Sequence, residues 1–253
     1  RFAYVLPPRG AAEKNRLTES FLARKLAEYE ALHAELTGTA SGLVPIKHRT
    51  ELMQNNLAPI SELYVSYESA QKLKVEAGNL VSHDLSPRQI CDLELLMNGG
   101  FNPLKGFLSE EDYNGVVENM RLADGSLWPM PITLDVSEEF AASLEIGQDI
   151  ALRDQEGVIL GTMTVTDRWT PDKSREAEKV FGADDAAHPA VNYLHNTAGK
   201  VYLGGPVTGI QQPVHYDFRG RRDTPNELRA LFRKLGWRKV VAFQTRNPLH
   251  RAH

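Results

Sequence analysis

Six polar side chains near the end of the sequence have types and spacing that suit an anion-binding site. They are Gln244, Thr245, Arg246, Asn247, His250 and His253. A guanidinium offers two parallel donors that match a tetrahedral oxyanion, and a carboxamide adds a donor without adding charge. Histidines three residues apart lie on one face of a helix, where they can offer imidazole donors to phosphates. The pattern predicts a site for sulfate, phosphate or nucleotide.

No side chain in this stretch is an obvious general base paired with a nucleophile. Catalysis would therefore rest on positioning and charge stabilisation, as is usual for phosphoryl and nucleotidyl transfer. His250 and His253 also have the spacing of half a metal site, but zinc takes three or four protein ligands, and no cysteine or carboxylate stands at ligand spacing nearby. We predict no protein-bound metal. On the residues alone, an anion site and two merely structural histidines remain equally open.

The elements that must position these side chains follow an α/β pattern. Thr224 is a predicted N-cap, with proline next and Glu227 completing a capping box, and Gly236 ends that helix. Lys239–Phe243 is a short apolar run typical of a strand buried in a parallel sheet, and Asn247–Pro248 begins another helix. Ligands bind at the carboxyl ends of such strands, where the following helix points its positive end at an anion. We predict that residues 215–253 begin a doubly wound α/β domain.

Charge is unevenly distributed along the chain. The net charge is −4, yet residues 216–253 contain ten Lys or Arg and three Asp or Glu, so this end carries +7 and the remainder −11. A basic end on an acidic protein favours a local anionic ligand over a duplex-binding surface, and we predict no nucleic-acid partner. The alternative on charge alone is a solvated basic helix face.

Composition indicates an ordinary globular protein, with 42% hydrophobic and 25% charged residues. No apolar run reaches the roughly 18 residues of a membrane span, and no signal-peptide pattern opens the sequence. We predict a cytoplasmic protein without membrane contact. The single cysteine, Cys91, lies within an apolar pattern and is predicted to be a small core residue rather than a reactive thiol.

The first 42 residues are predicted to be an N-terminal extension without an assigned function. Leucines and aromatic residues between Leu17 and Leu36 recur at helical spacing, so we expect an amphipathic helix there, followed by a flexible linker. The sequence begins with Arg1 rather than Met and ends within a motif. We therefore expect a fragment of a longer protein.

Residues 43–214 are predicted to form a small β-barrel-like domain with a few helices. Helical patterns begin at Ser86-Pro87 and at Ser109, and run to Met97 and to about Met120. Strands are predicted at 131–136, 149–153, 158–166 and 201–210, with a hairpin turn at residues 154–157. The chain as a whole is therefore expected to be of the α/β and mixed α+β class.

The C-terminal stretch also resembles a known family. Residues 243–253, FQTRNPLHRAH, match the signature QTRNPxHRAH of the ATP sulfurylases, also called sulfate adenylyltransferases, in which HxxH is the nucleotidyltransferase histidine motif. Residues 62–65, 98–108 and 224–229 resemble other parts of that family, so the resemblance covers about residues 57–253. It implies a PUA-like β-barrel domain followed by an α/β nucleotidyltransferase domain.

The resemblance implies that ATP and sulfate react to give adenosine 5′-phosphosulfate and pyrophosphate, with Mg²⁺ carried by ATP. A sulfate oxygen would attack the α-phosphorus. Gln244 and Arg246 would hold sulfate, while Thr245 and Asn247 would contact the phosphates. His250 and His253 would stabilise the α and β phosphates and the departing pyrophosphate. A homo-oligomer is expected, with a fused or associated adenylylsulfate kinase as a possible addition.

The sequence departs from the family in one respect. The later family motif GRDHAGPG has no counterpart in the 253 residues, so we expect that this chain alone does not catalyse the reaction. No Gly-x-x-x-x-Gly-Lys-Ser/Thr loop of a kinase domain occurs. The alternative is a non-catalytic PUA-like protein that binds RNA or a protein partner. A nucleic-acid face would need basic and aromatic residues interleaved in the β domain, whereas the basic excess lies after it.

Overall fold

The computed structural model describes residues 58–237 and residues 240–241. The chain divides into two compact units, Arg1–Asn56 and Leu57–His253, and every described residue belongs to the second unit. The predicted helix between Leu17 and Leu36 and the linker after it lie outside the described residues.

The described residues fold into a seven-stranded sheet with helices around it. The strands are β1 (Ser82–Asp84), β2 (Gly106–Phe107), β3 (Leu134–Val136), β4 (Asp149–Arg153), β5 (Ile159–Thr164), β6 (Asp167–Trp169) and β7 (Val201–Gly209). The helices are α3 (Tyr67–Ala77), α4 (Pro87–Met97), α5 (Glu110–Asn119), α6 (Glu138–Ala142), α7 (Lys173–Glu176) continued by the π-turn η2 (Ala177–Phe181), α8 (Pro189–Asn196), the 3₁₀ turn η3 (Arg219–Arg221) and α9 (Pro225–Lys234).

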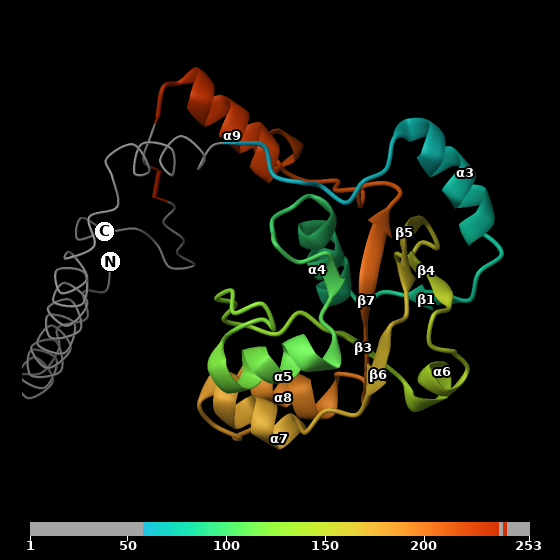
Figure 1. The fold of residues 1–253 in the computed structure, drawn as a ribbon, viewed down its shortest axis with the longest axis vertical. Helices are drawn as coiled ribbons and strands as arrows, with labels where there is room; N and C mark the ends of the chain where they lie inside the picture. The colour runs from blue at the N-terminus through green and yellow to red at the C-terminus, as the bar shows by residue number, and fades with distance from the viewer. Residues whose placement is uncertain (1–57, 238–239, 242–253) are drawn as a thin grey trace, which may run out of the picture. The chain divides into compact units, whose positions relative to one another are not determined.

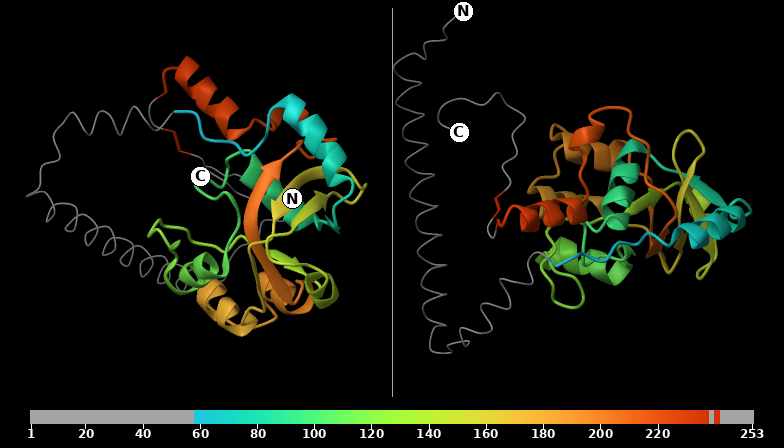
Figure 2. Two further views of the ribbon diagram at one scale, coloured as in Figure 1. Left: turned by 45° about the vertical axis from the view of Figure 1, so that its right-hand side comes forward. Right: turned by 90° about the horizontal axis from the view of Figure 1, so that it is seen from above.

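The sheet is a curled half-barrel built around its longest strand, β7 (Figure 1, Figure 2). The strand order is β1-β4-β5-β7-β2, and β3 and β6 also pair with β7. Within the described residues β1 and β2 do not pair with each other, so the sheet stays open. Only β1 and β4 are parallel; every other pairing is antiparallel. Four strands, β2, β3, β5 and β6, pair with β7, so the register of each of them is set against this one strand.

Two glycines in the middle of β7 allow this shared pairing. A Cβ on Gly204 would lie 2.3 Å from the carbonyl oxygen of Leu108, and one on Gly205 would lie 1.9 Å from that of Thr164. Gly205 also has a φ of 152°, which disfavours a side chain. Backbones therefore approach β7 closely from two directions, and only glycine leaves the necessary space.

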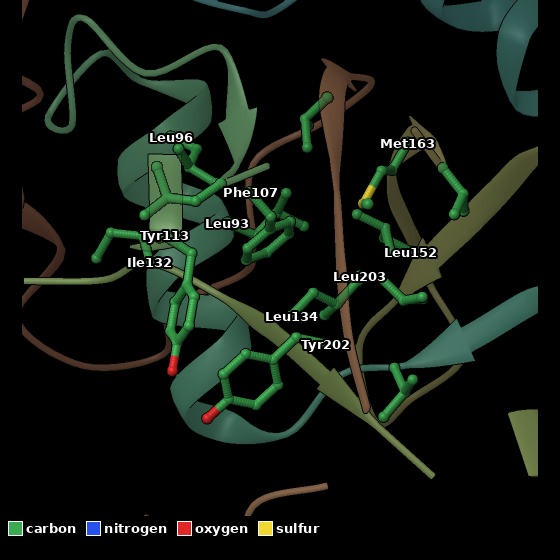
Figure 3. Close-up of a cluster of buried hydrophobic side chains, with 14 of the residues drawn as sticks. Leu93, Leu96, Phe107, Tyr113, Ile132, Leu134, Leu152, Met163, Tyr202 and Leu203 are labelled. Atoms are coloured by element: carbon green, nitrogen blue, oxygen red, sulfur yellow. The ribbon is translucent and has the colours of Figure 1, made fainter. Parts of the chain in front are cut away.

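The main core lies between β7, α4 and α5 (Figure 3). Leu93 of α4, Leu134 of β3 and Leu203 of β7 are fully buried. Burying each such side chain contributes roughly 1.5–3 kcal/mol relative to leaving it in water. This apolar packing of α4 and α5 against β7 stabilises the domain in addition to the hydrogen bonds between its short strands.

Both helix starts predicted for this domain are confirmed. Ser86 caps α4, and its side chain and that of Gln89 form a reciprocal capping box. The Ser109 hydroxyl accepts from the amide of Asp112 at the start of α5. The predicted hairpin is also confirmed, since β4 and β5 pair antiparallel around the turn that begins at Asp154. The two helix starts and the hairpin turn are therefore set by interactions within a few residues of sequence.

The prediction for Cys91 is wrong. Its side chain is exposed on α4. The buried face of this helix is formed instead by Gln89, Leu93, Leu96 and Met97. Cys91 lies two residues from both Gln89 and Leu93, about 200° around the helix, and so points away from the core. None of the helices in the described part of the chain has the length and apolar character needed to span a bilayer.

Candidate functional site

All six residues of the predicted anion site, residues 244–247, 250 and 253, lie outside the described residues. The structure does describe the helix that leads toward them, α9, together with the residues that hold this helix in place. It also reveals a buried polar cluster within the β domain that the sequence analysis did not single out.

The start of α9 is a reciprocal cap, as predicted. The Thr224 hydroxyl accepts from the Glu227 amide at 3.3 Å, and the Glu227 carboxylate accepts from the Thr224 amide at 2.7 Å. The backbone hydrogen bond from Thr224 lowers the pKa of Glu227. Two of the otherwise unsatisfied first-turn amides are thereby paired, which fixes where the helix begins.

The end of α9 is fixed by a Schellman motif. Gly236 adopts a φ of 70°, its amide donates to the carbonyl of Arg233, and the amide of Trp237 donates to that of Phe232. The rings of Phe232 and Trp237 stack with centroids 5.9 Å apart, which is the apolar contact that often accompanies this motif. The motif sets the direction in which the chain leaves α9.

The N-terminal half of α9 is tied to residues 58–62. The Asn226 side chain accepts from the amide of Ile60 at 2.8 Å and donates to its carbonyl at 3.0 Å, as a neighbouring strand would. It also donates to the Glu62 carboxylate at 2.6 Å. Arg229 donates to the carbonyl of Ala58 at 3.0 Å. Side chains of α9 therefore hold the beginning of the second predicted domain to residues 58–62, the segment that leads into the β domain.

The segment that receives Asn226 is itself part of the β domain. The amide of Leu63 donates to the carbonyl of Met97 at the end of α4, and Tyr64 forms a β-bridge with Gly209 at the end of β7. A continuous path of hydrogen bonds thus runs from the core through residues 58–65 to α9.

The predicted apolar face of α9 is present but uncovered in the described part of the chain. Leu231 and Leu235 are 43% and 49% exposed, and no side chain of the helix is buried. Val240 and Val241, from the predicted buried strand, lie in no strand and are 44% and 92% exposed, while the rest of that strand lies outside the described residues. A parallel strand is buried only when neighbouring strands and helices cover it, and no described element pairs with these two valines.

The cluster that sequence reasoning missed centres on Glu176, which is 6% exposed. Its Oε2 accepts from the hydroxyls of Tyr113, at 2.9 Å, and Tyr202, at 3.1 Å. Burial raises the pKa of Glu176, and these two hydrogen bonds oppose the rise. In Figure 3 both tyrosine hydroxyls point to the same side of the core. The three residues come from separate elements, so no local motif could have revealed them.

A second group of charges lies beside Glu176. Arg88 forms ion pairs with Asp92 and Asp135, and also donates to the Tyr193 hydroxyl and the carbonyl of Thr133. Burial raises the pKa of Asp92 to about 6, although the Arg88 charge opposes this shift. The guanidinium therefore has acceptors on three sides and acts as a structural cation.

Lys173 completes this group. Its ammonium donates to the carbonyls of Leu194 and Ala198, at 2.7 and 2.8 Å. Burial lowers the pKa of Lys173. Across residues 58–237 and 240–241, no three His, Cys, Asp or Glu side chains are arranged to hold a metal ion.

Two family models match the chain. The model described as PUA-like domain matches residues 54–212, and the model described as ATP-sulfurylase matches residues 219–253. The first match covers the half-barrel, and the second begins at η3 and includes α9 and the six predicted site residues.

Known proteins also match much of the chain. A sulfate adenylyltransferase of Mycosarcoma maydis is 54% identical over 187 residues, covering 73% of this chain and 33% of that protein. One from Gibberella zeae is 56% identical over 185 residues, covering 72% and 32%. One from Schizosaccharomyces pombe is 51% identical over 185 residues, covering 72% and 38%. The chain thus spans about a third of the length of these relatives.

A solved structure named "Hexameric APS kinase from Thiobacillus denitrificans" also matches. It superposes with a TM-score of 0.61 at 37% sequence identity, over 76% of this chain and 34% of that chain.

Proposed function

We propose that this chain, which belongs to the PUA-like domain family and whose residues 219–253 match the ATP-sulfurylase model, serves sulfate activation as a sulfate adenylyltransferase. The reaction joins ATP and sulfate into adenosine 5′-phosphosulfate and releases pyrophosphate. The observation that carries the proposal is the identity of 51–56% to sulfate adenylyltransferases over 185 residues of this chain. None of the comparisons favours the alternative of a non-catalytic binding protein.

The proposed site is the stretch that follows α9. Gln244 and Arg246 would hold sulfate, since a carboxamide and a guanidinium both donate to oxyanions. Sulfate is a poor nucleophile and attacks a phosphorus that is itself surrounded by negative charge. Oriented donors that offset this repulsion are therefore the main contribution that the protein can make.

The remaining site residues would act on the nucleotide. Thr245 and Asn247 would contact its phosphates, while His250 and His253 would stabilise the charge that develops on the departing pyrophosphate. Mg²⁺ would arrive with ATP and neutralise phosphate oxygens, and we propose no metal held by protein side chains alone. Arg251, on a different face of the same predicted helix, has no assigned role.

The domain boundaries and the assembly belong to the same proposal. Residues 43–214 would form the PUA-like domain and 215–253 the start of the nucleotidyltransferase domain, which the matches at 54–212 and 219–253 support. A homo-oligomer and a fused or associated adenylylsulfate kinase are supported by the solved relative, which is named a hexameric APS kinase. We propose the cytoplasm as the location.

The test is pyrophosphate release by the full-length natural protein. Purified protein is incubated with ATP and Mg²⁺, with and without sulfate, and pyrophosphate is measured continuously. We expect release that depends on sulfate and saturates with it. Release that is equal without sulfate, or no release at all, would refute the proposed activity.

A further inference from the structure

A cavity of about 340 Å³ lies beside Glu176 in the β domain. This volume falls within the range of pockets that hold small ligands, roughly 300–1,000 Å³. Much of its wall is apolar, from Met130, Pro131, Phe181 and Leu194. None of its lining residues belongs to the predicted anion site, so it calls for a separate explanation.

One oxygen of the buried carboxylate is left for an occupant of this cavity. Glu176 lines the cavity, and its Oε2 already accepts from the hydroxyls of Tyr113 and Tyr202. Among the described residues no donor reaches its other oxygen, Oε1. Oε1 is not among the fully enclosed polar atoms that lack a hydrogen bond in the described residues, so it is accessible from the cavity, where an occupant can donate to it.

The neighbouring cations do not supply that partner. Arg88 donates to two carboxylates, a hydroxyl and a carbonyl, and Lys173 donates to two carbonyls. Three carboxylates, those of Asp92, Asp135 and Glu176, stand against these two cations. Neither cation donates to Glu176 Oε1, and an ammonium group in the cavity would supply both a donor to this oxygen and a charge that favours the ionised carboxylate.

We propose that this cavity binds a primary ammonium group on a short apolar chain, with Glu176 Oε1 as the acceptor of its charged hydrogen bond. The apolar wall would cover the chain, and Phe181 adds an aromatic ring to it. Burial raises the pKa of Glu176, which is the shift that a bound cation would reverse. This inference concerns the β domain and stands independently of the proposed sulfate adenylyltransferase activity.

The experiment titrates the full-length protein with n-butylamine hydrochloride at neutral pH and follows binding by calorimetry. The uncharged isostere 1-butanol is titrated in parallel, as is Nα-acetyl-lysine methylamide. Saturable binding of butylamine that 1-butanol does not reproduce would support the proposal. Binding of the lysine derivative as well would identify a partner's lysine as a source, and its failure to bind would point to a free amine. No saturable binding, or equal binding of 1-butanol, would overturn the proposal.

Variants locate the binding. Glu176→Gln removes the charge at nearly constant size and should weaken butylamine binding about tenfold or more, since hydrogen bonds to charged groups are the strong ones. Glu139→Gln makes the same change on an exposed residue and should leave binding unchanged. Ala190→Leu fills the cavity without touching the carboxylate and should abolish binding. Unchanged affinity in Glu176→Gln overturns the proposal; should that variant not fold, unchanged affinity in Ala190→Leu does so instead.

Discussion

Replacing Asn226 by alanine should loosen the N-terminal half of α9 from residues 58–62. The change removes three hydrogen bonds, two to the backbone of Ile60 and one to the Glu62 carboxylate. At roughly 0.5–1 kcal/mol each, these contribute about 1.5–3 kcal/mol to holding the helix against the segment. All three are lost together because one carboxamide makes them, and no other described side chain bonds the Ile60 amide.

The assay is native-state hydrogen exchange, read at the amides of α9 and at Ile60. A local loss of about 1.5–3 kcal/mol corresponds to exchange that is roughly 10- to 100-fold faster at these sites. Asn119→Ala is the matched control, because Asn119 ends α5 on the exposed surface and its side chain forms no hydrogen bond to another described residue. Exchange in α9 that is the same in Asn226→Ala and Asn119→Ala would refute the view that this side chain anchors the helix.

Three further predictions concern stability; those for Gly205 and Asp92 are measured as the free energy of unfolding in denaturant, and that for Gly236 by hydrogen exchange. Gly205→Ala should cost about 4 kcal/mol or more, because the new Cβ meets the Thr164 carbonyl. Gly125 also has a positive φ, 86° against 152° at Gly205, but it has open space around it, so Gly125→Ala should cost only about 1 kcal/mol; equal costs would contradict the close packing at β7. Gly236→Ala should shorten the Schellman end of α9 at a cost of about 1 kcal/mol, seen as faster exchange at Trp237, and an unaltered rate there would count against the motif. The pKa of Asp92 is raised to about 6 in the folded protein. The contribution of this carboxyl to the free energy of unfolding is therefore fully present below about pH 4 and is lost as pH rises through 6. Asp92→Asn should therefore flatten the pH dependence of the free energy of unfolding between these values, by at most about 3 kcal/mol. A curve parallel to that of the unchanged protein would show that burial does not raise the pKa of this carboxyl.

The features that could be predicted from sequence are those decided within a few residues. Ser86, Ser109 and Thr224 each cap a helix because a short polar side chain reaches an amide three residues on, and the hairpin after β4 follows from a short turn between two apolar runs. Gly236 ended α9 for an equally local reason. Such boundaries need no knowledge of the rest of the fold.

Features that depend on distant segments could not be predicted in this way. The exposure of Cys91 depends on which face of α4 meets β7, and the apolar residues around it do not settle that choice. Glu176 meets Tyr113 across 63 residues of sequence and Tyr202 across 26. The sharing of β7 among four strands likewise follows from close backbone approaches at Gly204 and Gly205, which resemble ordinary strand glycines in the sequence.

The candidate anion site was inferred from residue types, a strand-then-helix pattern and a family resemblance, and its six residues remain a prediction. The structure confirms the helix that precedes them and shows how that helix is capped and anchored. The apolar face of α9 stays exposed in the described part of the chain.

The most direct test of the proposed activity is sulfate-dependent pyrophosphate release by the full-length protein carrying Arg246→Ala or, as the matched control, Arg251→Ala. Loss of one oriented donor from a charge-stabilising site typically lowers the rate about 100-fold or more. We expect that loss for Arg246→Ala, and near-normal release for Arg251→Ala, which removes the same charge at a position with no assigned role in the site. Normal release by Arg246→Ala would contradict the assignment of the C-terminal stretch as the site that binds sulfate.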